Sequence, residues 1–340
     1  MGRSGRRVAT SGIHTFFGRF LLDYWELDPD VERIIAVDVQ PPDFQSPKLK
    51  YREIDLTDPS ADEEIAEILK YHEVDTFVHS ALLSNPTHRS YWAHEFEVIG
   101  TMHVLNACSE AKIRRFVLPS RTMVYGAHPS NPNYLSEGHP LRGESTSRWV
   151  RDKVEAEKQV AAFAKENPEC AVAVLRFAPI LGSGVNNFMC RHFARQVIPV
   201  VAGYDPLMQF LHPDDALRAL RLTLDGEVRG TYNIVPTGVL PLSSILALGG
   251  RIPLPIPSFV LYPMTEVLWN AAMVDVPSVF LNYFRFVWAA AGDKARDELG
   301  FVADYAVRDV VAEFYRLRPP KHGGRARSPW VTTVGVADEL

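Results

Sequence analysis

The chain has little cysteine and no long unbroken apolar run. Its three cysteines, Cys108, Cys170 and Cys190, are odd in number and lack the spacing of a disulfide framework or a metal site. We therefore expect buried, unreactive thiols, no bound metal and a cytoplasmic location. The most apolar segment, Ile252–Val276, holds four prolines and a glutamate and falls short of the roughly 20 apolar residues of a membrane span.

A surplus of positive charge is also absent. Lys and Arg number 36 against 41 Asp and Glu, which gives a formal charge of −5. Binding to nucleic acid phosphates needs an excess of basic side chains on one face, so nucleic acid is not an expected partner. A small-molecule ligand fits this composition better.

The first half of the chain alternates short β-rich runs with helix-like windows, the pattern of a parallel sheet covered on both faces. This predicts an α/β fold with a doubly wound parallel sheet domain over residues 1–181. After Gly182 the alternation fades, which predicts a smaller mixed lobe over 182–317 that is interleaved with the sheet domain. Residues 318–340 are rich in Pro, Gly and Arg and are expected to form a flexible tail.

A glycine-containing turn joins the first strand to the first helix. It reads Gly12-x-x-Thr15-x-x-Gly18, with threonine where a third glycine would allow the closest approach of a ligand. Such a turn presents backbone N–H groups at a helix N-terminus to a pyrophosphate. The Thr15 hydroxyl is a further candidate for phosphate contact. A plain strand–helix turn is the alternative for this motif alone.

Polar or small residues follow the next three strands. Asp38 ends the second strand, where a carboxylate accepts hydrogen bonds from ribose hydroxyls and repels a 2′-phosphate, so NAD is expected rather than NADP. Asp55 and Leu56 follow the third strand, where they are placed to hydrogen-bond the edge of an adenine and to cover its face. Ser80 and Ala81 follow the fourth strand, where small side chains leave room for a cofactor above the sheet. Dinucleotide binding explains these signals together better than chance does.

These residues resemble the extended short-chain dehydrogenase/reductase superfamily, in particular its NAD-dependent epimerase/dehydratase branch. The runs RFVLPSRTMVYG, KVEAE, LRFAPILGSG, QFLHPDDA and DKARDELGF carry the resemblance over residues 7–317. It implies that the sheet domain is a Rossmann-type, NAD(P)-binding domain followed by a C-terminal substrate lobe. It implies hydride transfer on a nucleotide sugar or another small hydroxy or keto compound, and a homodimer through the helices expected over Glu95–Glu110 and Arg148–Lys165. It also adds Phe17 and Pro179 to the cofactor-contacting residues.

The resemblance implies four catalytic positions, and three of them are altered. The asparagine position holds Glu97, the Ser/Thr position Arg121 and the tyrosine position Trp149, while Lys153 keeps the usual lysine. A lysine and a tyrosine at i and i+4 could aim at one substrate oxygen, but an indole N–H does not titrate. Lys153 could hold the nicotinamide ribose without catalysis, or be a solvated helix lysine.

Several alternatives remain at this site. Arg121 and Glu97 could form a buried ion pair, or Arg121 could bind an anionic ligand. Tyr125, Tyr134 or His139 could replace the missing tyrosine, and Trp149 could simply pack a cleft wall. Gln209 stands where an arginine often begins the substrate-lobe motif, so binding of a sugar-nucleotide diphosphate is in doubt. The sequence thus predicts an atypical enzyme, a non-catalytic NAD(P)-binding sensor or a structural subunit.

Overall fold

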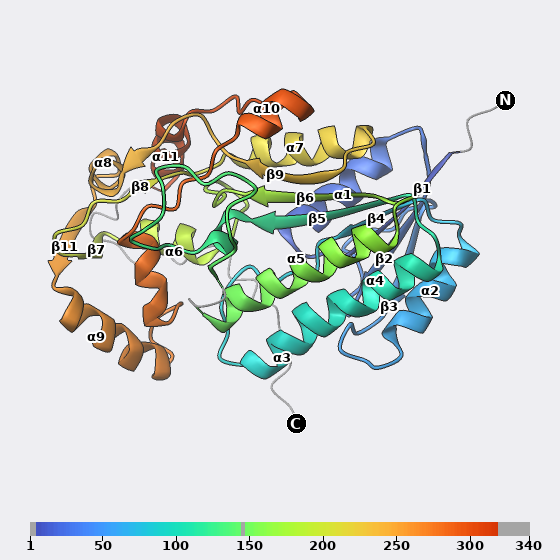
Figure 1. The fold of residues 1–340 in the computed structure, drawn as a ribbon, viewed down its shortest axis with the longest axis horizontal. Coiled ribbons are helices and arrows are strands. Elements are labelled where there is room, and N and C mark those ends of the chain that lie inside the picture. Colours follow the sequence, from blue (N-terminus) through green and yellow to red (C-terminus); the bar gives the residue numbers. More distant parts are fainter. Residues whose placement is uncertain (1–4, 144–146, 319–340) are drawn as a thin grey trace.

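A seven-stranded parallel sheet forms the centre of the protein in a computed structural model that describes residues 5–143 and 147–318 (Figure 1). The strand order is β3-β2-β1-β4-β5-β6-β9. This is the doubly wound arrangement predicted from the sequence, and the order reverses between β1 and β4. The strands are β1 (Arg6–Ser11), β2 (Val31–Asp38), β3 (Leu49–Glu53), β4 (Thr76–His79), β5 (Arg115–Arg121), β6 (Ala171–Phe177) and β9 (Gly230–Ile234).

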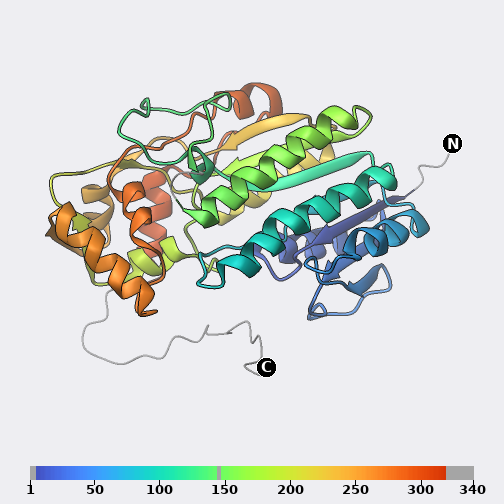
Figure 2. The same cartoon turned by 60° about the horizontal axis from the view of Figure 1, so that its bottom comes forward.

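Helices cover both faces of the sheet (Figure 2). On one face lie α2 (Ala61–Tyr71), α4 (Gly100–Glu110) and α5 (Arg148–Glu166), and on the other lie α1 (Phe16–Leu27) and α7 (Pro213–Asp225). Two buried apolar clusters, one beneath each helix layer, fill the space between helices and strands. Strands buried on both faces need such continuous apolar runs, which explains why their positions could be predicted from the sequence.

The smaller part of the protein contains two short two-stranded sheets and further helices. Here β7 (Val197–Val201) pairs in parallel with β11 (Ile252–Ile256), and β8 (Leu207–Met208) pairs with β10 (Leu240–Pro241). Strand β9 comes from the same half of the chain but joins the main sheet beside β6. The division at residue 181 stays a prediction. The helices are α6 (Phe188–Ala194), α8 (Leu242–Leu248), α9 (Ser258–Asn270), α10 (Asp293–Leu299) and α11 (Val307–Arg316).

One helix differs from its predicted form. The window expected as a single helix over Glu95–Glu110 begins as a π-helix, η1 (Glu95–Ile99), between α3 (Ser90–His94) and α4. A π-helical turn contains one residue more than an α-helical turn, so the side chains that follow it are rotated about the helix axis. Such bulges are frequent at functional sites. Within the described ranges, none of the helices has the length and apolar character needed to cross a membrane.

Candidate functional site

The glycine turn after β1 closes tightly against the turn after β4. Gly12 has φ +71°, and a Cβ there would lie 2.6 Å from the backbone of Ala81. At Gly18 a Cβ would lie 2.1 Å from the carbonyl oxygen of Gly12. Both positions therefore require glycine, so at these two points the turn has no side chain between its backbone and the carboxyl edge of the sheet.

The Thr15 hydroxyl is engaged within this turn. Its Oγ1 donates to the carbonyl oxygen of Gly12 at 2.8 Å and accepts from the Gly18 N–H at 3.0 Å. Thr15 is thus the N-cap of α1, and its side chain holds the turn in shape. The next-but-one residue, Phe17, packs its ring on Phe177 at 4.6 Å between centroids, so it joins α1 to the end of β6.

Asp38 lies directly beside the glycine turn. Its Oδ2 accepts from the Ile13 N–H at 2.9 Å and its Oδ1 accepts from the Val39 N–H at 2.8 Å. Oδ1 also accepts from the Gln40 N–H at 3.4 Å, whereas Oδ2 has one backbone donor and keeps a lone pair for another. The two oxygens are held at the edge where the ribose of a dinucleotide would lie.

The residues after β3 and β4 complete this edge. Asp55 is exposed and accepts from the Thr57 N–H at 2.9 Å, while Leu56 is buried against Gly100, where a Cβ would come within 2.9 Å of it. Ser80 is buried, and its hydroxyl has no hydrogen-bond partner among the described residues. An unpartnered hydroxyl beside a glycine turn is a polar group that a ligand could satisfy.

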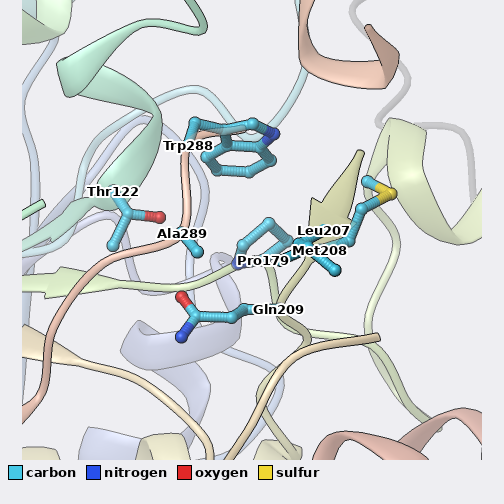
Figure 3. A pocket seen from close by; sticks show the side chains of 7 residues that line it. All are labelled: Thr122, Pro179, Leu207, Met208, Gln209, Trp288 and Ala289. Atoms are coloured by element: carbon cyan, nitrogen blue, oxygen red, sulfur yellow. The ribbon is translucent and has the colours of Figure 1, made fainter. Parts of the chain in front are cut away.

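Pro179 follows β6 and lines a narrow pocket. Its carbonyl oxygen accepts from the Leu211 N–H at 3.0 Å. In Figure 3 the Trp288 ring lies over one side of this pocket and the amide of Gln209 over the other. The residues that line it are Thr122, Pro179, Leu207, Met208, Gln209, Trp288 and Ala289.

The four positions that the resemblance implies for catalysis come together in one group, here called the Trp149 cluster: Glu97, Arg121, Trp149 and Lys153, of which all but the half-buried Arg121 are buried. Lys153 is only 2 % exposed, so the solvated-lysine alternative is wrong. Its Nζ donates to Glu97 Oε1 at 2.5 Å and lies 4.0 Å from the centroid of the Trp149 ring. Glu97 Oε1 also accepts from the Leu83 N–H at 2.6 Å. The ammonium therefore has both a counter-ion and an aromatic face.

Arg121 does not pair with Glu97 as one alternative supposed. Its Nη2 and Nη1 lie 3.4 and 3.5 Å from the carbonyl oxygens of Leu83 and Ser84, and its Cζ lies 5.4 Å from the Trp149 ring centroid. The π-helix presents Glu97 to α5, so Lys153 becomes its partner instead. Trp149 packs against Phe280 at 5.6 Å between centroids, and its indole N–H has no partner among the described residues.

Burial dominates the electrostatics of the Trp149 cluster. It raises the pKa of Glu97, against the opposing effect of Lys153. It lowers the pKa of Lys153 to about 8, and it lowers the pKa of Arg121. Lys153 and Glu97 are both buried and neutralise each other, so neither charge can be removed without leaving the other unpaired.

Tyr125 does not take over the role of the missing tyrosine, while a role for Tyr134 or His139 stays a prediction. Tyr125 is fully buried, donates its hydroxyl to Asn233 Oδ1 at 2.7 Å and accepts from Arg176 at 2.8 Å. Burial raises its pKa, opposite to the shift that activates a phenol for proton transfer. Tyr134 is half exposed, and the ring of His139 lies beside that of Tyr125, at 6.1 Å between centroids.

Gln209 forms a structural bridge. Its Oε1 accepts from the Ala290 N–H at 2.9 Å and its Nε2 donates to the Ala290 carbonyl oxygen at 3.1 Å. Both ends of the amide are thus bonded to the backbone of Ala290, which lies shortly before α10. A bridge of this kind offers no cation to a diphosphate.

Sequence reasoning missed a buried polar chain that joins the glycine turn to the Trp149 cluster. The Ser11 hydroxyl lies 2.7 Å from His79 Nδ1, and His79 Nε2 lies 3.0 Å from Thr101 Oγ1. Thr101 donates to the carbonyl oxygen of Glu97 at 2.5 Å. The available signal was His79 itself, a histidine at the end of a buried strand directly before Ser80 and Ala81.

The buried His79 predicts a loss of stability in mild acid. Burial lowers its pKa to about 4 from an ordinary value of 6.5. The unfolded chain binds more protons between these values, so the stabilisation is complete above pH 6.5 and decreases as pH falls towards 4. Urea unfolding should show His79 contributing about 2 kcal/mol to the loss between pH 7 and pH 5. A His79→Gln variant with the same pH dependence as the wild type would contradict this.

Comparison with known proteins agrees with this geometry. The model of the NAD dependent epimerase/dehydratase family matches residues 9–235. An uncharacterized protein of Mycobacterium tuberculosis is 28% identical over 97% of this chain and 89% of its own length. A 3-diazoavenalumate denitrifying reductase of Streptomyces is 28% identical over 43% of this chain and 49% of its own.

Solved structures share the fold. MoeE5, in complex with UDP-glucuronic acid and NAD, has a TM-score of 0.68 and 24% identity over 92% of this chain and 99% of its own. A dTDP-glucose 4,6-dehydratase from Streptomyces venezuelae with NAD bound has a TM-score of 0.69 and 20% identity over 91% of this chain and 96% of its own. The family model covers most of the chain, and the sheet and the glycine turn agree with it. The protein therefore belongs to the NAD-dependent epimerase/dehydratase family.

Proposed function

We propose that this protein binds NAD at the carboxyl edge of its sheet without carrying out the tyrosine-dependent hydride transfer of its family. The residues fit the dinucleotide. Gly12 and Gly18 leave a turn open to phosphate, Asp38 offers a carboxylate fixed by backbone N–H groups to a ribose, and Ser80 supplies an unpartnered hydroxyl. Bound NAD would supply a nicotinamide able to accept or donate a hydride.

One observation carries the non-catalytic part of the proposal: Lys153 is buried, paired with Glu97 and covered by Trp149. A proton-transfer group must reach the proton that it moves, within about 3 Å or through one water. The ammonium instead has its donors turned to a carboxylate in the protein interior. In this account the cluster stabilises the site and closes the place where a substrate oxygen would be activated.

The residue at position 209 argues against a nucleotide sugar as the ligand, because Gln209 stands where the family often has an arginine. Its amide is bonded at both ends to Ala290, and a diphosphate is normally bound by the fixed guanidinium fork of arginine. As a sensor or regulatory protein, the chain would therefore bind a nicotinamide coenzyme as its ligand and not a sugar nucleotide. A homodimer through α4 and α5 stays a prediction that belongs to this proposal.

The lowered pKa of Lys153 favours a second candidate function. The pKa of Lys153 is lowered to about 8, and an amine that titrates near neutral pH can serve as an acid or base. Under this alternative the protein is an atypical oxidoreductase or epimerase in which Lys153 takes over from the missing tyrosine.

A turnover assay separates the two candidates. Wild-type protein is incubated with NAD and panels of nucleotide sugars and alcohols, and with NADH and carbonyl compounds, while absorbance at the reduced nicotinamide band is followed. We expect no turnover above that of a Lys153→Ala variant whose folding has been checked by circular dichroism. Turnover by the wild type that this substitution abolishes would establish the enzyme alternative and overturn the non-catalytic proposal.

A further inference from the structure

Arg121 is a half-buried cation at the end of β5, on the carboxyl edge of the sheet where doubly wound folds bind their ligands. In the part of the chain that the structure describes, its guanidinium forms no ion pair. Its acceptors are the carbonyl oxygens of Leu83 and Ser84, at 3.4 and 3.5 Å, which are long distances for hydrogen bonds. A guanidinium withdrawn from solvent normally has a carboxylate or a phosphate as its partner.

The carboxylates near Arg121 are bound to other groups. Glu97 Oε1 accepts from Lys153 Nζ at 2.5 Å, so this carboxylate neutralises the ammonium. Asp152 is buried on the same helix as Lys153, and its Oδ1 lies 2.9 Å from His94 Nδ1. Neither carboxylate forms an ion pair with Arg121. The guanidinium is therefore left for an anion from outside the chain.

A second donor of the Trp149 cluster also lacks a partner. The Trp149 side chain is buried, and its indole N–H has no hydrogen-bond partner among the described residues. Buried polar groups without a partner are rare in native proteins, and a bound ligand is one explanation for them. Arg121 Cζ lies 5.4 Å from the centroid of this ring, so the two unsatisfied donors belong to neighbouring groups. Contact with the ring also holds the guanidinium in place.

We propose that Arg121 and the indole N–H of Trp149 bind the carboxylate of a small organic acid. The inference rests on the proposed function, because it needs a site that holds a ligand and does not transfer protons through a tyrosine. A guanidinium donates two parallel hydrogen bonds to a carboxylate.

The surroundings of Arg121 favour a carboxylate over a phosphate. One unpaired cation balances the single charge of a carboxylate, whereas a phosphate group carries nearly two charges at neutral pH. Lys153, the other cation of the cluster, is already paired with Glu97. The apolar side chains of Leu83 and Trp149 lie beside the guanidinium, as in ligand sites where a few polar groups orient an apolar body.

Isothermal titration calorimetry of the full-length protein with benzoate tests this inference. The titration is carried out with and without saturating NAD, and repeated with inorganic phosphate. We expect saturable binding of benzoate with a Kd of about 1 mM, as for a ligand of this size, and weaker binding of phosphate. Arg121→Gln should weaken benzoate binding at least about tenfold, since it removes a charge-assisted pair of hydrogen bonds.

Three further variants sharpen the test. Arg121→Lys keeps the charge without the planar fork and should bind with intermediate affinity, which also covers the case that Arg121→Gln does not fold. Trp149→Phe keeps an aromatic ring and removes the N–H, so we expect a loss of about fivefold. Arg114→Gln is the matched control, because it removes an exposed arginine directly before β5, at the opposite end of the strand. Its affinity for benzoate should stay within about twofold of the wild type.

The inference is overturned if the wild type shows no saturable binding of benzoate, or if phosphate binds more tightly than benzoate. It is also overturned if Arg121→Gln and Arg121→Lys bind benzoate as well as Arg114→Gln does. A separate NADH titration distinguishes this failure from that of the proposed function. Binding of NADH without binding of benzoate would refute the carboxylate site alone. Benzoate binding that depends on Arg121, in a protein without affinity for NADH, would support the carboxylate site and refute the proposed function.

Discussion

Replacing Asp38 by alanine should weaken NADH binding by about 100-fold, because two charge-assisted hydrogen bonds to the adenosine ribose are lost. The carboxylate is already oriented for them by the N–H groups of Ile13 and Val39. The same substitution removes the charge that repels a 2′-phosphate. The preference for NADH over NADPH should therefore narrow, as measured by fluorescence titration with each coenzyme.

The control for this substitution is Asp43→Ala, which removes an exposed carboxylate from the loop that follows Asp38. We expect its affinity for NADH to remain within about twofold of the wild type, because an exposed charge outside the site contributes little in physiological salt. If Asp38→Ala bound NADH as well as Asp43→Ala does, the ribose would not be held at the end of β2.

Replacing Lys153 by methionine should destabilise the protein by about 3–5 kcal/mol, since the substitution leaves the buried Glu97 carboxylate without its counter-ion. Adding Glu97→Gln should restore most of this loss. Glutamine keeps an oxygen for the Leu83 N–H and removes the unpaired charge. Urea unfolding of the two single variants and the double variant measures the coupling between the two positions.

Lys158→Met provides the comparison on the same helix. This lysine is exposed, so its substitution should change the unfolding free energy by no more than about 0.5 kcal/mol. The interpretation of Lys153 and Glu97 as a buried ion pair that stabilises the fold would be wrong if Lys153→Met were as stable as Lys158→Met.

The fold could be predicted from the sequence because its signals are local and repeated. The sheet follows from short apolar runs separated by helical windows, and β6 (Ala171–Phe177), buried along its whole length, is one such run. The edge that could hold a dinucleotide follows as well, since the carboxyl ends of neighbouring parallel strands meet there. Gly12 and Asp38 are 26 residues apart in the chain, yet the carboxylate of Asp38 accepts from the residue after Gly12.

The interior of the catalytic region could not be predicted in the same way. Which cation pairs with Glu97 depends on the π-turn of η1, and a one-residue helical bulge leaves no clear mark in the hydrophobic pattern. The commitment of Gln209 to Ala290 likewise joins residues 81 positions apart. Contacts between distant segments are set by tertiary packing, which periodicity does not encode.

Titration of the wild-type protein with NADH, followed by nicotinamide fluorescence, tests the central claim most directly. The account predicts saturable binding of one NADH per chain and weaker binding of NADPH. An absence of affinity for either coenzyme would contradict it, because the glycine turn and Asp38 would then form an ordinary strand–helix connection and not a cofactor site.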